Sequence, residues 1–257
     1  TWLKDNSPEP LGSADAYYQI YPKVPVGDNF TYPESAYGVL AWWDYGYWIS
    51  RIAHRIPNSN PSQDPVAIIN VASFFTSQNE TAAAEIRQKL SSAYVVIDHE
   101  TTLSKFWAII TWAGKNTTDY FDTYFVQQKP GQPLQQVILY YPEYYRSMAV
   151  RMFNFDGKAV TPDNVLVISS SVNKNNAGQT FKVVTGVQQF ATYQEAEAFL
   201  ASQPSGSYRI AGSGPLKSPV PLEALERYKI VHSSDNYTVS LNDGTTMPSV
   251  KIFEYVR

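Results

Sequence analysis

The 257-residue sequence contains no cysteine and few charged residues. The absence of cysteine excludes a disulfide framework, a thiolate zinc site and a cysteine nucleophile. Charged residues make up 17% of the chain, and 20 Lys and Arg against 23 Asp and Glu give a net charge of −3. Nucleic-acid binders usually carry a basic excess that meets the phosphate backbone, so we do not expect a nucleic-acid partner.

Long apolar runs and targeting signals are also missing. No stretch approaches the ~18 consecutive apolar residues that span a bilayer, and the N-terminus lacks the basic and apolar regions of a signal peptide. We therefore expect a soluble chain, either complete or cut from a longer membrane protein.

The usual catalytic motifs are absent as well. The three histidines form no His-Glu-x-x-His pattern, and no Gly-x-Ser-x-Gly nucleophile elbow is present. Gly212-Ser213-Gly214 lacks the third glycine of a phosphate-binding loop. The carboxylates are scattered, and their spacing selects no glycosidase pair. These patterns point to no standard active site.

What the chain does contain is 44% apolar and 14% aromatic residues, enough for a sizeable core. Residues 79–92 are typical of a helix capped by Asn79, and residues 93–97 are typical of a buried strand. Further helices are expected over 64–75, with Asp64 as cap and Pro65 at the first position, and over 101–113 and 142–153. The order helix, strand, helix predicts a layered α/β core.

The sequence becomes strand-like after Asp156-Gly157. One helix is expected over 193–201, and Asn242-Asp243-Gly244 has the chemistry of a hairpin turn. Strands are expected at 165–168, 180–184, 208–210, 228–231, 237–241 and 250–253. We therefore predict an α+β fold, with a helix-rich mixed α/β core over 1–158 and a mainly β accessory unit over 159–257.

One aromatic segment stands apart, Trp42-Trp43-Asp44-Tyr45-Gly46-Tyr47-Trp48-Ile49. Such density is typical of a core or of a surface that stacks on sugars. A carboxylate beside two indoles, however, is costly to bury unless it receives hydrogen bonds. Indole Nε1 only donates and an ionised carboxylate only accepts, so together they can surround one hydroxyl group completely. The segment therefore has the chemistry of a hydroxyl-binding site.

Trp42-Trp43-Asp44-Tyr45-Gly46 is also identified as the five-residue signature of oligosaccharyltransferase catalytic subunits, which glycosylate asparagine. The chain resembles the C-terminal globular domain of an archaeal member. The resemblance continues over residues 2–8, 52–63 and 251–256, and so extends over essentially the whole chain.

The family carries a second motif, in which an Asp and a Lys precede an Ile or Met. Asp98, Lys105 and Ile109 match its longer-spaced archaeal form. Some archaeal relatives carry Met three residues after the Asp, where this chain has Thr101. If Asp98 begins a helix, these positions step by three or four residues and lie on one face.

The resemblance implies that the chain recognises acceptor sequons, Asn-x-Ser/Thr. Trp42, Trp43 and Asp44 would bind the hydroxyl of the +2 residue, and Ile109 would contact the methyl group of Thr. Tyr45, Gly46, Asp98 and Lys105 would support this pocket, and Lys105 has the least certain role. The domain would lie on the extracellular face of the cell membrane.

The resemblance also implies an enzyme larger than this chain. The whole protein would transfer a glycan from a dolichyl-phosphate-linked donor to asparagine, using Mn or Mg held by acidic loops of a membrane region. We expect no catalytic residue, metal or cofactor in this chain, and no transfer by the chain alone. Its partners would be the acceptor peptide and, through the membrane region, the lipid-linked oligosaccharide.

Two other functions compete with this interpretation. A free-standing carbohydrate-binding module would use exposed Trp and Tyr rings as platforms. A secreted glycoside hydrolase would use a pair of carboxylates drawn from Asp44, Asp98 and Glu100, roughly 5–10 Å apart.

Overall fold

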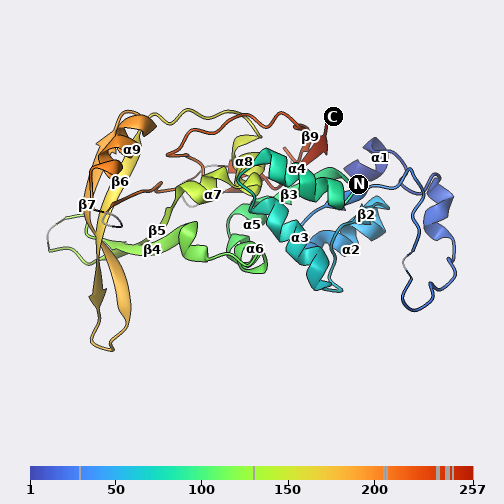
Figure 1. Cartoon of the computed structure of the whole chain (residues 1–257), viewed down its shortest axis with the longest axis horizontal. Helices are drawn as coiled ribbons and strands as arrows, with labels where there is room; N and C mark the ends of the chain where they lie inside the picture. Colours follow the sequence, from blue (N-terminus) through green and yellow to red (C-terminus); the bar gives the residue numbers. More distant parts are fainter. Residues whose placement is uncertain are drawn as a thin grey trace. The chain divides into compact units, whose positions relative to one another are not determined.

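The computed structural model describes residues 1–28, 30–129, 131–204, 206, 208–235, 238–240, 244 and 246–256. The chain forms two compact units (Figure 1). The first unit comprises residues 1–74, 81–99 and 227–257, and the second comprises residues 75–80 and 100–226. The predicted boundary near residue 158 therefore falls inside the second unit, because the last segment of the chain returns to the sheet of the first.

A five-stranded mixed sheet forms the centre of the first unit. Its order is β2-β1-β3-β12-β9, in which β1 runs parallel to β2 and β3, and β12 runs antiparallel to β3 and β9. The strands are β1 (Gly38–Leu40), β2 (Ile56–Pro57), β3 (Ser92–Asp98), β9 (Tyr228–Ser233) and β12 (Val250–Tyr255). A separate pair, β10 (Thr238–Ser240) and β11 (Thr246–Pro248), is antiparallel. The predicted turn at Asn242-Asp243 lies outside the described residues.

Short and regular helices accompany this sheet. The two regular ones, α3 (Pro65–Phe75) and α4 (Glu80–Lys89), lie where they were predicted. Asp64 caps α3, since its Oδ1 accepts from the Ala67 amide at 2.9 Å. The others are α1 (Trp2–Asn6), α2 (Gly46–Trp48), the 3₁₀ turns η1 (Ala14–Tyr18) and η2 (Trp43–Tyr45), and the π-helical turn η3 (Ile49–Ala53).

The second unit has its own five-stranded sheet, in the order β5-β4-β7-β6-β8. Its strands are β4 (Phe121–Val126), β5 (Gln135–Tyr140), β6 (Val165–Lys174), β7 (Thr180–Phe190) and β8 (Tyr208–Ile210). Its helices are α5 (His99–Thr102), α6 (Phe106–Trp112), α7 (Pro142–Arg146), α8 (Met148–Phe155) and α9 (Tyr193–Ala201), with the 3₁₀ turn η4 (Thr117–Asp119). Helix α9 spans the predicted residues and opens with a capping box between Thr192 and Glu195.

The predicted α+β class is confirmed, but two predicted helices are broken. Residues 142–153 form α7 and α8, because Ser147 is extended (φ −63°, ψ 144°) and its hydroxyl caps the second helix at Val150. Residues 101–113 form α5 and α6, separated by a turn at 103–105. No helix among the described residues is long and apolar enough to cross a membrane.

The core of the first unit supports the aromatic segment directly. Val39 and Ala41 precede residues 42–46, Ile49 and Ala53 follow these residues, and all four are buried in one apolar cluster. Leu3, Tyr94 and Ile252 complete the buried part of that cluster, which joins α1, β3 and β12. Residues 42–46 are thus fixed at both ends by core packing.

Candidate functional site

The Trp-Trp-Asp-Tyr-Gly segment leaves the end of β1 and turns at once into η2. Trp42 is buried, whereas Trp43 and Asp44 are half-buried. The two indole rings lie close together, with centroids 6.3 Å apart and planes tilted by 54°. Oδ1 of Asp44 is shielded from solvent. The segment therefore carries two neighbouring indole rings and one carboxylate on a single tight turn.

Gly46 occupies a position where no side chain fits. A Cβ there would lie 2.4 Å from the Ser59 carbonyl oxygen and 2.4 Å from Cβ of Asn60. The chain after β2 thus passes directly against the backbone at Gly46, and the Ser59 hydroxyl donates to the Ala41 carbonyl at 3.1 Å. This close approach explains the glycine of the motif and fixes the turn from behind.

Tyr45 and Asp98 connect the two predicted motifs within the first unit. The Tyr45 hydroxyl donates a hydrogen bond to Oδ2 of Asp98. Asp98 is 5% exposed, and it is the last residue of β3, paired with Val250 of β12. A rigid central strand therefore holds the tyrosine of the aromatic segment.

A cavity of about 370 Å³ adjoins this hydrogen bond. Tyr45 and Asp98 contribute to its wall, and most of the remaining lining is apolar. The ring of Trp2 lies in the wall and stacks on His232 at 5.2 Å. The other lining residues are Thr1, Leu3, Trp48, Ile49, Ile52, Ala53, Val96, Val250 and Ile252.

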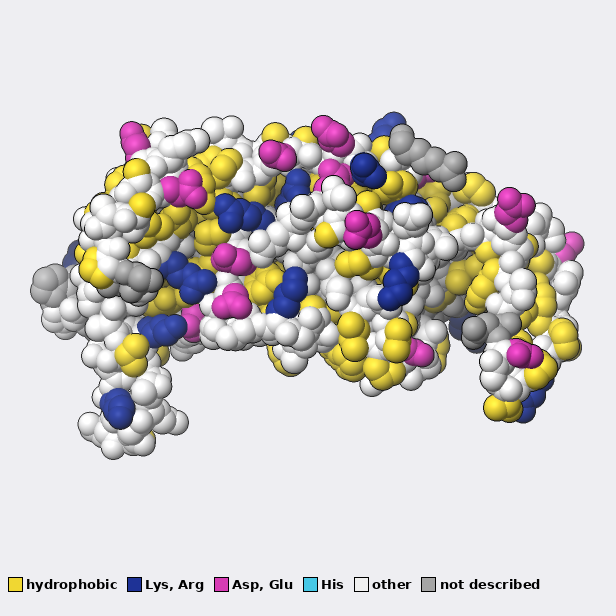
Figure 2. Space-filling model, in the orientation of Figure 1, with side chains coloured by type: hydrophobic (Ala, Val, Ile, Leu, Met, Phe, Trp, Pro, Cys, Tyr) yellow, Lys and Arg dark blue, Asp and Glu magenta, His cyan; other side chains and the backbone are white. Residues whose placement is uncertain are grey.

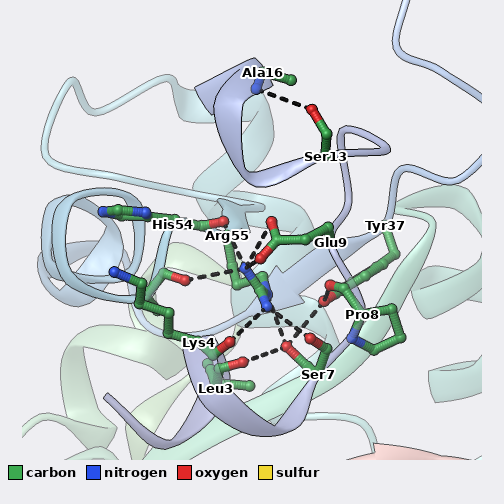
Figure 3. A network of polar contacts seen from close by, with 11 residues as sticks. Leu3, Lys4, Ser7, Pro8, Glu9, Ser13, Ala16, Tyr37, His54 and Arg55 are labelled. Carbon is green, nitrogen blue, oxygen red and sulfur yellow. Dashed lines mark hydrogen bonds and ion pairs between the residues drawn. The ribbon is translucent and has the colours of Figure 1, made fainter. Parts of the chain in front are cut away.

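Arg55 anchors the beginning of the chain to the stretch that follows the aromatic segment (Figure 3). It is 2% exposed, and its Nε donates to the Ser7 hydroxyl at 2.7 Å. Its terminal nitrogens donate to the carbonyls of Ser7 and Lys4 at 2.6 and 3.0 Å and form an ion pair with Glu9 at 3.3 Å. Further bonds reach the carbonyls of Ala53 and His54. A buried guanidinium with this many acceptors ties these two segments of the chain together.

Sequence reasoning missed this role of Arg55. The sequence carries no clear signal for it, because Arg51 and His54 stand close by and the chain reversal before Arg55 is visible only in the structure. That reversal occurs at His54, whose φ of 52° is left-handed and ends η3. The buried polar cluster around Arg55 therefore lies directly after the aromatic segment, and the Trp-Trp-Asp-Tyr-Gly motif does not predict it.

The predicted common helix face of Asp98, Lys105 and Ile109 is wrong. Asp98 lies in a strand, Lys105 is the N-cap residue of α6, and Ile109 is in its interior. In the turn between α5 and α6, the backbone amides of Leu103 and Lys105 donate to the Glu100 carbonyl at 3.2 and 2.8 Å. Pairing of β3 with β12 keeps Asp98 extended, so the helix cannot begin there.

The two later residues of this motif have different surroundings. Nζ of Lys105 lies 2.6 Å from Oε2 of Glu100, so the two side chains form an ion pair. Ile109 is completely buried. The aromatic segment and Asp98 belong to the first unit, whereas Lys105 and Ile109 belong to the second.

Two tyrosines of the first unit, Tyr94 and Tyr37, have raised pKa values. Burial, and next the nearby charge of Glu254, raises the pKa of Tyr94 to about 12, and its hydroxyl lies 3.3 Å from Oε1 of that glutamate. Burial also raises the pKa of Tyr37, whose hydroxyl donates to the Pro8 carbonyl at 2.6 Å. Both phenols are therefore neutral donors at physiological pH.

Comparison with known proteins shows which proteins this chain resembles. Residues 1–102 match the family model of the AglB core domain. Dolichyl-phosphooligosaccharide-protein glycotransferase 3 of Archaeoglobus fulgidus is 32% identical over 215 residues, 71% of this chain and 25% of that protein. Residues 1–102 are thus similar to an AglB core domain. The chain spans about a quarter of the length of the curated relatives it matches.

Solved structures extend the AglB likeness to the whole chain. An Archaeoglobus fulgidus oligosaccharyltransferase, tethered to an acceptor peptide with an NVT sequon, gives a TM-score of 0.59 at 24% identity, covering 99% of this chain and 32% of that one. AglB from the same organism, with an inhibitory peptide and a dolichol-phosphate, gives 0.51 at 25% identity, covering 100% and 36%. The expected resemblance to archaeal oligosaccharyltransferases is confirmed.

The described residues offer no group of three or more His, Asp or Glu side chains placed to bind a metal ion. A crystal structure of an Archaeoglobus fulgidus oligosaccharyltransferase is a complex with Zn and sulfate, with a TM-score of 0.50 and 18% identity to this chain. That likeness concerns the fold alone.

Proposed function

We propose that this chain recognises Asn-x-Ser/Thr sequons as the extracellular domain of a membrane oligosaccharyltransferase. The whole enzyme would transfer a glycan from a dolichyl-phosphate-linked donor to the asparagine of an acceptor protein. The observation that supports this most strongly is the tight turn that brings Trp42, Trp43 and Asp44 together. The similarity to the AglB core domain and the peptide-bound and dolichol-phosphate-bound relatives support the same function.

The turn supplies the complement of one hydroxyl group. The Asp44 carboxylate would accept the hydroxyl proton of the +2 Ser or Thr, and the indole N–H groups of Trp42 and Trp43 would donate to its oxygen. A peptide without that hydroxyl would desolvate the carboxylate and give it no hydrogen bond in exchange. This costs about 1–3 kcal/mol or more, a loss of roughly tenfold to a hundredfold in binding.

Holding the +2 residue would position the acceptor asparagine. Its amide nitrogen is a weak nucleophile, because the lone pair is delocalised into the carbonyl. A fixed peptide keeps that nitrogen near the donor and lowers the entropic part of the barrier. Activation of the amide would fall to Mn or Mg and the acidic loops of the membrane region, and the donor lipid would bind there as well.

Ile109 would distinguish Thr from Ser through the Thr methyl group. Burying one methyl contributes about 0.8 kcal/mol, so Thr would be preferred roughly fourfold. Because Ile109 is completely buried in the chain without peptide, this contact requires α6 or its preceding turn to move when the acceptor binds. Tyr45, Gly46 and Asp98 would position the hydroxyl site, and Lys105 would hold the turn before α6 through Glu100.

The test is glycan transfer by the full-length enzyme carrying Asp44→Ala. We expect transfer to Asn-x-Thr peptides to be lost while binding of the lipid-linked donor is retained. Asp163→Ala is the matched control, since this carboxylate is exposed and pairs with Lys217 at 3.1 Å. Near-normal transfer by Asp44→Ala would refute the hydroxyl site.

A binding measurement separates this function from a carbohydrate-binding module. The 257-residue chain should bind an Asn-x-Thr peptide weakly and its Asn-x-Ala counterpart not at all, and free oligosaccharide should not compete. Tight binding of oligosaccharide without any peptide binding would favour the module.

A further inference from the structure

The sequence itself contains four Asn-x-Ser/Thr sequons in which x is not proline, beginning at Asn29, Asn79, Asn116 and Asn236. Such sequons are acceptors for N-linked glycans where they lie on an exposed loop outside the cell. Asn29 and Asn236 lie outside the described residues. The two sequons that the structure describes, at Asn79 and Asn116, have different surroundings, and the difference indicates which of them can be modified.

The sequon Asn116-Thr117-Thr118 lies on the turn between α6 and β4, which Figure 1 draws in green. Asn116 and Thr118 are both exposed. Oδ1 of Asn116 accepts from the Thr118 amide at 3.2 Å. Because Oδ1 and Nδ2 lie on opposite sides of Cγ, this bond directs Nδ2, the atom that would receive a sugar, away from the backbone of Thr118. Among the described residues, none beyond the chain neighbours of Gly114 lies within 4 Å of a Cβ built there, so the surface before the turn is open.

This turn can open without disturbing the core. Tyr120, directly after it, is 2% exposed and packs edge-on against Phe106, so the chain is fixed there. The turn itself is the single 3₁₀ turn η4, closed by a bond from the Asp119 amide to the Asn116 carbonyl at 3.1 Å. Arg209 donates to two carbonyl groups of the turn at 3.4 and 3.1 Å, through hydrogen bonds that are exposed. Short 3₁₀ turns and exposed hydrogen bonds open more easily than regular, buried structure.

The sequon at Asn79 is held in regular structure instead. Asn79 directly precedes the ten-residue helix α4, and Thr81 lies in the first turn of that helix. Oε2 of Glu80, the middle residue of the sequon, accepts from the Glu226 amide at 3.2 Å. Ala83 of the same helix is completely buried. Extending this sequon would unwind the first turn of α4 and disturb the packing of the core.

We propose that Asn116 is an N-glycosylation site of this chain, whereas Asn79 stays unmodified in the folded state. The inference rests on the proposed function, which supplies the enzyme and the dolichyl-phosphate-linked donor. The bond from C1 of the glycan to the lipid phosphate oxygen breaks, and the phosphate leaves with its electron pair. A bond from C1 to Nδ2 of Asn116 forms, and one Nδ2 proton passes to solvent. The exposed Thr118 supplies the +2 hydroxyl that such an enzyme requires.

A glycan would also suit the surface of this chain. Charged residues make up only 17% of the sequence, and Figure 2 shows hydrophobic side chains exposed over the face in view, with charged ones scattered among them. A glycan is bulky and strongly hydrated, so it would add polar surface to a chain that has few charges.

The test uses the folded 257-residue chain as the acceptor, with the full-length enzyme and its lipid-linked donor. Mass spectrometry of proteolytic peptides should find glycan on Asn116 and none on Asn79. Unfolded peptides of residues 112–122 and 75–85 are the matched controls, and both should be modified because neither sequon is then held in structure. An unmodified Asn116 in the folded chain, or equal modification of Asn79, would overturn the proposal.

Two substitutions at the exposed Thr118 check that modification follows the sequon. Thr118→Ala should slow it roughly tenfold to a hundredfold, because the +2 hydroxyl is lost. Thr118→Ser restores the hydroxyl and should slow it only roughly fourfold, through loss of the methyl group. Modification of Asn116 that is unaffected by Thr118→Ala would contradict a sequon-dependent transfer.

An ordinary Asn-x-Thr peptide in the same assay separates the two proposals. Transfer to that peptide without transfer to Asn116 would overturn this inference and leave the proposed function standing, whereas no transfer to either would refute the proposed function. Peptide mapping of the full-length protein purified from its own cells then decides the inference independently of the assay. Glycan on Asn116 is expected there, and an unmodified Asn116 would overturn the proposal.

Discussion

The segment 38–60, which carries the aromatic motif, and the segment 99–109, which carries Lys105 and Ile109, differ in how firmly the chain holds them. The first is clamped by core packing, by the close approach at Gly46 and by the buried Arg55 cluster. The second consists of a four-residue helix, a turn and a seven-residue helix, with a half-exposed ion pair at the turn. Helices this short have little stability of their own.

The difference suggests a division of labour. A carboxylate that reads a hydroxyl must be preorganised, because reorganising a charged group on binding is costly. A methyl contact contributes little, so the residue that makes it can sit on a segment that moves. Substitutions that remove one of the contacts clamping the first segment should therefore lower the stability of the chain, and those in the second segment should mainly alter specificity.

The largest effect is expected from Arg55→Met. Removing the guanidinium leaves buried carbonyls of Lys4 and Ser7 without donors, at a cost of about 3–5 kcal/mol in the free energy of unfolding. Urea unfolding followed by tryptophan fluorescence measures this. Arg51→Met, an exposed arginine on η3, should change stability by less than about 0.5 kcal/mol. Equal stabilities of the two variants would show that the cluster is not a clamp.

The second largest loss of stability is expected from Gly46→Ala. The added Cβ would meet the Ser59 carbonyl and Asn60, so the backbone must shift, at about 1–3 kcal/mol. Gly214→Ala is the control, because nothing lies within 4 Å of a Cβ there. If Gly46→Ala retains full stability and full transfer, the turn at residues 42–46 is not held rigidly, and the contrast between the two segments fails.

The sequence predicts the structure of the first of these two segments better than that of the second. The Trp-Trp-Asp-Tyr-Gly motif, α3 with its Asp64 cap and α9 with its capping box are local patterns, and local physics determines them. The spacing from Asp98 to Lys105 would fit a helix that begins at Asp98, whereas pairing with β12, some 150 residues later, makes Asp98 a strand residue.

The same reasoning accounts for the other misses. Strands β4 and β5 have mixed polar and apolar residues, and their pairing with each other and of β4 with β7 decides their conformation. Arg55 finds its acceptors on α1 and the loop after it, which no periodicity reveals. Long-range partners, rather than weak propensities, set the limit of prediction here.

A smaller effect on stability is expected from Ile109→Val, at about 0.5–1.5 kcal/mol. The informative measurement for this variant is its preference for Asn-x-Thr over Asn-x-Ser peptides. If Ile109 contacts the Thr methyl, the ratio of transfer to Asn-x-Thr over Asn-x-Ser peptides should fall. Ile110→Val is a close control, since Ile110 is also completely buried in α6. It should cost similar stability and leave the ratio unchanged. The same fall in both variants would mean that packing of α6, and not this methyl contact, sets the preference.

Lys105→Gln should have the smallest effect on stability. The side chains of Lys105 and Glu100 are 28% and 40% exposed, so their ion pair contributes about 0.2–1 kcal/mol despite the short distance. A double-mutant cycle with Glu100→Gln measures this coupling, which should weaken as salt is added. If Lys105 only holds the turn, both single variants should alter the Thr-over-Ser ratio alike, because either one releases α6. A large loss of transfer for Lys105→Gln without one for Glu100→Gln would assign the lysine a direct contact with the acceptor peptide.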